Sequence, residues 1–458
     1  MASQGYGQDQ SVPLSSPRVE LIVAWRKIAE LRPNSKNSRI HNRRQRRQIA
    51  RSIRLFGFCV PILIDGNDRV IAGHGRLMAA EDLGMTEVPT ICLDHLSDAQ
   101  AKALMLADNK LAENASWDDR LLAEALKELS QLDLDFDLEA TGFEMGEIDL
   151  RIEGLNIPAE GPDPADLIPN PAAGAAVTRA GDLWLLGEHR IRCGSALDSA
   201  SYSALMNAER AAMVFTDHPY NLRIEGHVSG LGAIHHREFA MATGEMSEVQ
   251  YTDFLTRSCS LLARYSAAGS LHFVCIDWRH VRELLAAGRA AYKELVNLCV
   301  WVKHNAGMGS LYRSQYELVL VFKSSRGRHR NNVELGRNGR SRSNVWQYPA
   351  INDFGRAGEE GNLLALHPTV KPVAMVADAI MDCTARGDIV LDGFLGSGTT
   401  VIAAQRTGRR CYGLEIDPLY VDTAVRRWQI FTRERARHAE AGCSFEELAN
   451  TRMAHHDQ

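Results

Sequence analysis

The segment 389–404 constrains the fold of this chain more than any other. An apolar, β-branched run ends in Asp392, passes through a glycine-rich turn and continues as a helical pattern from Thr399. Glycines allow a sharp turn and a close approach of a ligand to the backbone, and the helix that follows presents free N–H groups to an anionic group. A second apolar run, 411–414, ends in Glu415, where a doubly wound sheet binds ribose hydroxyls. These features predict a nucleotide-type pocket.

The spacing of the glycines narrows the choice of ligand. Gly393, Gly396 and Gly398 are spaced G-x-x-G-x-G, whereas dinucleotide sites have G-x-G-x-x-G. No lysine follows the last glycine, so a P-loop is excluded. The turn therefore favours neither a dinucleotide nor a nucleoside triphosphate. A tight turn without any ligand is the competing interpretation.

Length and composition are those of a soluble globular protein. The 458 residues suffice for about two to four domains, and 45% are hydrophobic and 24% charged. The first 16 residues are polar without a secretory pattern, and no apolar run reaches bilayer length. Nine cysteines occur without a C-x-x-C pair, which indicates reduced thiols. We therefore expect a cytoplasmic protein with no bound metal and no membrane contact.

Charge is distributed unevenly although the net charge is only −5. Residues 31–64 contain nine Lys or Arg and no acid, which favours a phosphate-facing surface that includes Arg43, Arg44 and Arg47. Residues 323–342 contain seven Lys or Arg and one acid, Glu334. The predicted DNA contacts there are Arg328, Arg330, Arg337, Arg340 and Arg342.

The N-terminal part has the pattern of a small α+β domain. Strands are expected at 61–64, 69–72 and 88–93, and helices at 77–83 and 97–109. Gly73-His74-Gly75-Arg76 precedes the first of these helices, as in an anion site. The runs 70–80 and 107–114 resemble the ParB/sulfiredoxin-like N-terminal domain. In ParB proteins the corresponding turn holds the phosphates of CTP, so the resemblance implies CTP as a ligand, although Gly75 replaces the first of two basic residues. A retained fold that contacts DNA or protein is the alternative.

The C-terminal part alternates strands and helices, which predicts a mostly parallel, doubly wound α/β sheet with helices on both faces. The expected strands are 213–216, 270–276, 295–302, 316–322, 389–392 and 411–414, and the expected helices are 249–265, 278–292, 372–384 and one from 399. The predicted organisation is a disordered N-terminus (1–16), the ParB-like domain (17–115), a helical extension (116–155), a Pro/Ala-rich linker (156–178), the α/β domain (179–437, with 323–365 as candidate target-recognition region) and a C-terminal tail (438–458).

Four ordered elements of the α/β domain resemble the DNA amino-methyltransferases that use S-adenosylmethionine, in the permuted order in which the catalytic motif comes first. They are Asp217-His218-Pro219-Tyr220 for D-P-P-Y, His367-Pro368-Thr369-Val370-Lys371-Pro372 for H-P-T-x-K-P, residues 392–400 for D-P-F-x-G-S-G-T-T, and Glu415-Ile416-Asp417-Pro418 for the acidic motif. The sequence departs from the family at His218 and at Gly393, both of which replace proline.

The resemblance implies roles for these residues. Asp217 and the carbonyl of His218 would accept the N–H groups of a base amine, next to Pro219, and Tyr220 would stack on the flipped base. The implied cofactor-binding residues are Asp198, Thr369, Lys371, Asp392, Phe394, Gly396, Ser397, Gly398, Thr399, Thr400, Glu415 and Asp417.

Our hypothesis is a methyltransferase of double-stranded DNA, acting on adenine, of the restriction-modification kind, with a homodimer as one oligomeric option. The same chemistry on cytosine is the closest alternative. Because of His218 and Gly393 we also consider a DNA-binding adaptor that has lost turnover, and because of the N-terminal domain a partition-type nucleotide switch.

Overall fold

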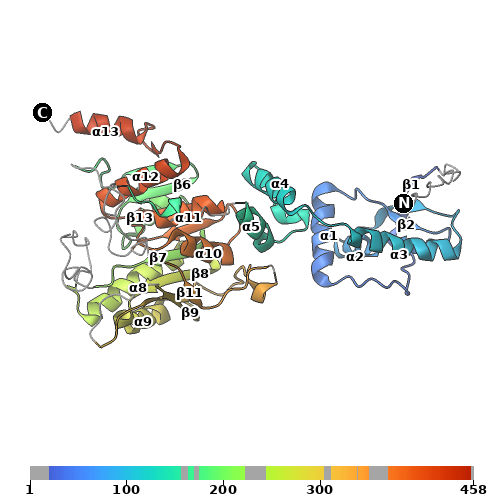
Figure 1. Cartoon of the computed structure of the whole chain (residues 1–458), viewed down its shortest axis with the longest axis horizontal. Coiled ribbons are helices and arrows are strands. Elements are labelled where there is room, and N and C mark those ends of the chain that lie inside the picture. Colours follow the sequence, from blue (N-terminus) through green and yellow to red (C-terminus); the bar gives the residue numbers. More distant parts are fainter. Residues whose placement is uncertain are drawn as a thin grey trace, which may run out of the picture. The chain divides into compact units, whose positions relative to one another are not determined.

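The computed structural model describes residues 20–155, 163–169, 175–221, 244–303, 311–337, 339–349 and 370–454. The chain divides into two compact units (Figure 1). The N-terminal unit comprises Met1–Asp119 and Asp133–Phe143, and the C-terminal unit comprises Arg120–Leu132 and Glu144–Gln458. The predicted disordered N-terminus, 1–16, lies outside the described residues. No helix in the described ranges has the length and apolar character needed to span a bilayer.

The N-terminal unit is an α+β domain with a four-stranded sheet of order β1-β4-β2-β3. Its elements are β1 (Val23–Lys27), η1 (Ile28–Glu30), α1 (Arg43–Phe56), β2 (Ile62–Ile64), β3 (Val70–Ala72), α2 (His74–Asp82), β4 (Glu87–Cys92), α3 (Asp98–Asn114) and η2 (Leu138–Thr141). Ile62, Ile64, Val70 and Leu77 form its core. The helix α2 begins three residues earlier than predicted, because Gly73 adopts a left-handed φ of 99° immediately before it.

The C-terminal unit is built on a ten-stranded sheet of order β11-β9-β10-β8-β7-β12-β13-β6-β5-β14. The strands are β5 (Leu183–Leu186), β6 (His189–Cys193), β7 (Ala211–Asp217), β8 (Ser266–Ile276), β9 (Glu294–Val302), β10 (Tyr316–Lys323), β11 (Val345–Gln347), β12 (Ile389–Asp392), β13 (Arg410–Glu415) and β14 (Arg437–His438). The five central strands β8-β7-β12-β13-β6 run parallel. β10 pairs antiparallel with both β8 and β9, so this half of the sheet is mixed.

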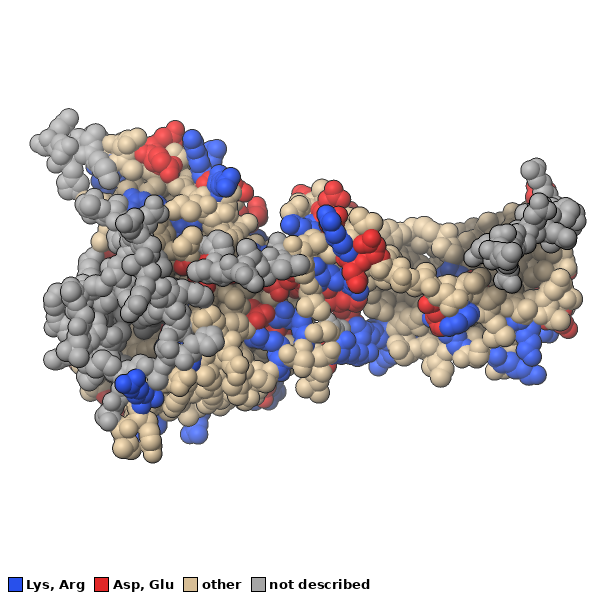
Figure 2. Space-filling model, viewed as in Figure 1, with Lys and Arg blue, Asp and Glu red and all other residues tan. Residues whose placement is uncertain are grey.

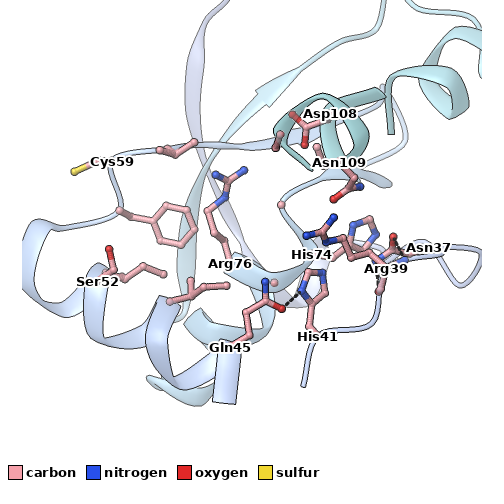
Figure 3. A pocket seen from close by; sticks show the side chains of 18 of the residues that line it. Asn37, Arg39, His41, Gln45, Ser52, Cys59, His74, Arg76, Asp108 and Asn109 are labelled. Atoms are coloured by element: carbon pink, nitrogen blue, oxygen red, sulfur yellow. Dashed lines mark hydrogen bonds between the residues drawn. The ribbon is translucent and has the colours of Figure 1, made fainter. Parts of the chain in front are cut away.

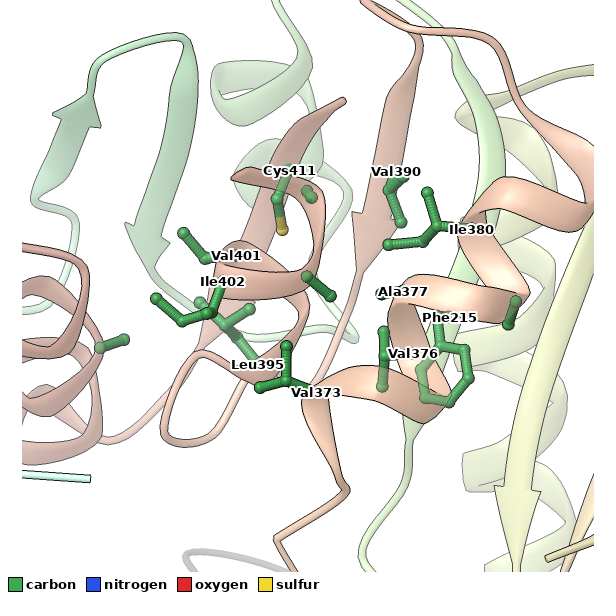
Figure 4. Packing of buried hydrophobic residues seen from close by; sticks show 14 of the residues in the cluster. Phe215, Val373, Val376, Ala377, Ile380, Val390, Leu395, Val401, Ile402 and Cys411 are labelled. Atoms are coloured by element: carbon green, nitrogen blue, oxygen red, sulfur yellow. The ribbon is translucent and has the colours of Figure 1, made fainter. Parts of the chain in front are cut away.

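Helices cover both faces of this sheet, which confirms the predicted α/β class. The described helices of this unit are α4 (Asp119–Gln131), α5 (Met145–Gly154), η3 (Pro164–Asp166), α6 (Ser199–Met206), α8 (Glu248–Arg264), η4 (Trp278–His280), α9 (Val281–Ala291), η5 (Glu334–Gly336), α10 (Val373–Cys383), α11 (Thr399–Thr407), α12 (Pro418–Thr432) and α13 (Phe445–Ala454). Successive strand residues point to opposite faces. Phe215 and Val390 pack with α10 and α11 (Figure 4), whereas Val214 and Leu391 pack with α6.

Buried hydrogen bonds attach the segments that precede the sheet to the C-terminal unit. Asp149 of α5 is fully buried and receives two hydrogen bonds from the Arg409 guanidinium, at 2.9 and 2.7 Å. Asp166, inside the predicted linker, accepts from the backbone N–H of Val373 at 2.8 Å. Polar side chains thus bind α5 to the connection between α11 and β13, and part of the predicted linker to the start of α10. The predicted C-terminal tail contains α13.

Candidate functional site

Three carboxylates lie at the same edge of the sheet. β7 ends in Asp217, β12 in Asp392 and β13 in Glu415, and these strands are parallel neighbours. The carboxyl ends of parallel strands form the ligand-binding edge of an open α/β sheet. The structure therefore brings together the acids that the sequence placed at three separate strand ends.

The glycine turn after β12 is held by Asp392. This buried carboxylate accepts from the backbone N–H of Phe394 at 3.0 Å and from the Thr400 hydroxyl at 2.6 Å. Burial raises its pKa to about 6. Gly398 has a φ of 85°, and a Cβ there would meet the Cβ of Ala424 at 2.8 Å. Only glycine therefore allows this turn and the close approach of α11 and α12.

Glu415 connects the end of β13 to the same turn. Its carboxylate accepts from the backbone N–H of Gly396 and from that of Asp417, both at 2.8 Å. Burial raises its pKa to about 7, so the group changes charge near neutral pH. Two acids with raised pKa at one sheet edge are a feature of functional sites.

Asp217 lies in a network of charged side chains. Its Oδ2 accepts from the Lys371 ammonium at 2.5 Å, and its Oδ1 accepts from the Tyr220 hydroxyl at 2.6 Å. The same ammonium lies 3.0 Å from Glu317, whose other oxygen accepts from Lys303 at 2.6 Å. Two carboxylates and two ammonium groups thus alternate, with Lys371 and Glu317 buried and Asp217 and Lys303 partly exposed.

The network balances its own charges. Burial alone would raise the pKa of Glu317, but the ammonium groups of Lys371 and Lys303 lower it to about 2. Burial would likewise lower the pKa of Lys371, and Asp217 and Glu317 raise it instead. For Asp217, burial raises the pKa and the ammonium of Lys371 acts against this. Neutralising one member would therefore leave another buried charge without its partner.

The ring of His218, the second residue of the motif 217–220, is buried. Its Nε2 lies 2.9 Å from the Ser258 hydroxyl, and its centroid lies 4.7 Å from that of Phe394 and 6.3 Å from that of Phe254. Burial lowers its pKa to about 3, so the ring is neutral at physiological pH. This histidine packs as an uncharged aromatic group.

The other predicted site residues take varied positions. Lys371 contacts Asp217, and its assignment to the cofactor stays a prediction. Asp198 uses its carboxylate to cap α6, and Asp417 caps α12. Pro219 offers its carbonyl to the Tyr251 hydroxyl at 2.8 Å. Thr369, and with it His367 and Pro368, lies outside the described residues.

Buried hydrogen bonds also fix the end of the glycine turn. Arg427 donates to the backbone carbonyl of Ser397 at 3.2 Å and to the Thr399 hydroxyl at 3.1 Å. These contacts hold the start of α11 from the side of α12. The hydroxyl of Thr399 therefore has a structural role besides any contact with a ligand.

Two predicted DNA contacts also have an internal role. The side chain of Arg340 is only 5% exposed and pairs with Asp378 and Asp382, and Arg342 pairs with the same two acids. Their charges attach this segment to α10, and a contact of either arginine with DNA stays a prediction. Of the other predicted DNA contacts, Arg43, Arg47, Arg328 and Arg337 are exposed, and Arg44 and Arg330 are half-buried. Arg326, in the same basic segment, is also exposed. On the face drawn in Figure 2, basic groups form separate clusters among acidic ones.

The N-terminal unit has a cleft of about 680 Å³ between α1, α2 and α3 (Figure 3). Arg76 lines it, and the Nε of this arginine is buried without a hydrogen-bond partner among the described groups. A Cβ at Gly75 would lie 2.9 Å from Nδ1 of His41, so a glycine leaves room for that ring. His74 is buried and its Nε2 accepts from the backbone N–H of Asn34 at 3.3 Å.

Three protein-family models match successive parts of the chain. The ParB N-terminal domain matches residues 16–110, a ParB-methyltransferase HTH domain matches 120–180, and the N6/N4 DNA methylase family matches 211–426. The chain joins a ParB N-terminal domain to an N6/N4 DNA methylase domain. The helix-turn-helix match covers the segment that the sequence predicted only as a helical extension and linker, and it includes α4 and α5.

Individual relatives match parts of this ParB–methylase chain. The ParB-like nuclease domain-containing protein YnaK of Escherichia coli (strain K12) is 46% identical over 81 residues, which are 18% of this chain and 93% of YnaK. Type II methyltransferase M.ScaI of Streptomyces caespitosus is 35% identical over 19% of this chain and 29% of its own length. Type II methyltransferase M2.MboI of Moraxella bovis is 28% identical over 30% of this chain and 51% of its own length. The matches thus span about half or less of these two methyltransferases.

Among solved structures, the cytosine-N4-specific PvuII DNA methyltransferase is similar at a TM-score of 0.40 and 15% identity, over 58% of this chain and 91% of that one.

Two members of the candidate site were absent from the sequence prediction, Glu317 and Lys303. A signal for Glu317 was present, since a lone acid in an otherwise apolar strand is rarely buried without a partner.

Proposed function

We propose that the C-terminal unit transfers a methyl group from S-adenosylmethionine to the exocyclic amine of adenine in double-stranded DNA. The proposed location of this reaction is the cytoplasm. The observation that carries the proposal is the half-buried Asp217, held at the end of β7 next to the glycine turn that follows β12. Membership of the N6/N4 methylase family limits the reaction to an adenine or cytosine amine. An aspartate at position 217 favours adenine.

The residues at the sheet edge suit this cofactor. Carboxylates accept from ribose hydroxyls, and Glu415 and Asp392 lie at the ends of adjacent strands beside the glycine turn. Their negative charge would also attract a cationic ligand into a poorly hydrated site. When bound, S-adenosylmethionine supplies an electrophilic methyl group on a cationic sulfur.

Asp217 would act on the base amine. The lone pair of this nitrogen is delocalised into the ring, and a carboxylate that accepts one N–H localises it toward the methyl group. The lone pair forms the new N–C bond, the S–C bond breaks with its electrons left on sulfur, and the surplus proton passes to Asp217 or to solvent. Because the target atom is inaccessible inside a duplex, the base must leave the stack. Positioning and electrostatics supply the rate, and no covalent enzyme intermediate is needed.

The experiment is single-turnover methylation of a DNA pool with labelled cofactor. Asp217→Ala should abolish transfer and leave cofactor affinity nearly unchanged, because this interaction matters mainly in the transition state. Asp253→Ala removes an exposed acid from α8 and is the matched control. Equal rates for Asp217→Ala and the wild type would contradict the assignment. A further variant, His218→Pro, restores the residue of the family motif. If this variant alone transfers methyl groups and the wild type does not, the adaptor hypothesis is favoured.

Analysis of the methylated nucleosides decides between the two bases. N6-methyladenine alone would support the proposal. N4-methylcytosine would show that the target base is cytosine, with the same residues in the same roles.

A second candidate function, nucleotide binding by the N-terminal unit, is favoured by one observation. The buried Nε of Arg76 has no hydrogen-bond partner among the described groups, and it faces a cleft large enough for a ligand (Figure 3). We propose CTP as the ligand, with its phosphates near Gly73–Arg76. Calorimetric titration with CTP and with ATP should give binding of CTP only, and Arg76→Ala should weaken it at least tenfold, as expected for loss of a charged hydrogen bond. Sedimentation with and without CTP tests the proposed homodimer.

A further inference from the structure

Glu317 is unusual for a residue of β10, because it is an acid with a 7% exposed side chain that lies one residue from the start of an otherwise apolar strand. Its carboxylate is shared between two ammonium groups, those of Lys371 and Lys303. Only Lys371 also reaches Asp217. Glu317 therefore determines where the charged end of Lys371 lies relative to the proposed catalytic carboxylate.

The three N–H donors of the Lys371 ammonium point to Asp217, Glu317 and the Tyr220 hydroxyl, the last at 3.3 Å, so a hydrogen bond to a base would replace this longest contact. An ionised carboxylate has about four acceptor positions. Within the described part of the chain, Asp217 uses two of these positions, one for Lys371 and one for Tyr220. Capacity for an incoming amine therefore remains. A hydrogen-bond acceptor, Asp217, and a donor, Lys371, lie next to each other at 2.5 Å in the place where the base is expected.

This adjacent pair is complementary to one edge of both candidate bases. The Watson–Crick edge of adenine presents the amine next to ring N1, and that of cytosine presents the amine next to ring N3. In each case a donor stands beside an acceptor. An amine bound by Asp217 would bring the ring nitrogen toward the N–H groups of Lys371, since flipped bases are recognised through this edge.

We propose that Lys371 donates a hydrogen bond to the ring nitrogen next to the methylated amine, and that Glu317 is the positioning residue that holds Lys371 for this contact. The inference rests on the proposed function and adds to it the group that orients the base. In this arrangement Asp217 binds the reacting amine and Lys371 fixes the plane of the ring. Lys303 binds the other oxygen of the Glu317 carboxylate, away from the one that Lys371 uses.

The test combines variants with base analogues. Once the methylated base and site are known, single-turnover rates are measured on DNA with the natural base and on DNA with its deaza analogue, 1-deazaadenine or 3-deazacytosine. The analogue keeps the amine and lacks the ring acceptor. In the wild type it should lower the rate about tenfold or more, the cost of a hydrogen bond to a charged group. In Glu317→Gln the ratio of the two rates should fall to about threefold or less, because Lys371 is drawn onto Asp217.

The matched control is Lys303→Met, which removes a cation from the same network without touching the donor. Its ratio of rates should equal that of the wild type, whatever its absolute rate. The analogue's own reactivity cancels when ratios from two proteins are compared. A carboxylate that only stabilises the fold would slow both DNAs by the same factor.

Two results would overturn the inference: equal ratios in Glu317→Gln and the wild type, or no penalty for the analogue in the wild type. The second needs no variant and holds even if Glu317→Gln does not fold. A wild type that methylates no DNA would instead refute the proposed function itself, so the two failures are distinguishable.

Discussion

Replacing Glu415 by glutamine tests the proposed cofactor pocket most directly. The carboxylate is buried, accepts two backbone N–H bonds at 2.8 Å and lies at the end of β13 beside the glycine turn. A hydrogen bond to a charged group contributes roughly 1.5–3 kcal/mol, so loss of the ribose contact should weaken S-adenosylmethionine about 10- to 150-fold. Calorimetric titration measures this, with the exposed Glu434→Gln as control.

The pKa of Glu415 gives the same experiment a second readout. Burial raises this pKa to about 7, and the hydroxyls of ribose bind the ionised form. At pH 6 about one tenth of the carboxyl groups are ionised and at pH 8 about nine tenths, so affinity in the wild type should rise about tenfold between them. Glu415→Gln cannot ionise and should show no such rise. Equal affinities of wild type and variant at pH 8 would remove Glu415 from the ribose role, and an equal pH dependence would assign the titration to another group.

Three further predictions follow from single contacts. Neutralising the exposed Arg326 and Arg328 should reduce the slope of log affinity for DNA against log salt by about 0.9 per lost phosphate contact, whereas Arg340→Gln should leave the slope unchanged; equal effects would contradict the internal role of that arginine. Asp149→Ala leaves a buried guanidinium unpaired and should lower the free energy of unfolding by about 3–5 kcal/mol in denaturant titrations, and a loss under about 1 kcal/mol would show that water enters there. Gly398→Ala combines strained backbone with a Cβ contact of 2.8 Å and should reduce both thermal stability and cofactor affinity, so unchanged values of both would show that the turn can relax.

Local sequence patterns predicted most of the secondary structure. The helix expected at 249–265 is α8, Glu248–Arg264, and its start is encoded by the capping box of Ser247 and Gln250. The strand expected at 316–322 is β10, Tyr316–Lys323. In both, the information lies within a few residues of the element. The attachment of α5 could not be predicted in this way, because its buried ion pair joins Asp149 to a residue 260 positions away.

Some residues of the candidate site could likewise be located from local sequence, and others depended on contacts between distant segments. Asp217, Asp392 and Glu415 could be located because each ends a strand, and parallel strands end at a common edge. Glu317 and Lys303 could not, since they approach the site only through the antiparallel pairing of β9 and β10 with β8. The family resemblance implied Lys371 as a cofactor residue, and its contact with Asp217 was not part of that expectation. Which carboxylate a flexible lysine reaches depends on the fold around it.

The two departures from the family pattern have local packing explanations. At position 218 the imidazole fills a buried space between Phe254 and Phe394 and meets the Ser258 hydroxyl, which a proline ring could not do. At position 393 a Cβ would lie 3.1 Å from the Tyr202 hydroxyl, closer than most such contacts, so glycine leaves room for that ring. In both places the neighbours fit the residue that this chain has, and neither departure removes a side chain from the edge where the three carboxylates meet. These contacts favour the methyltransferase over the adaptor.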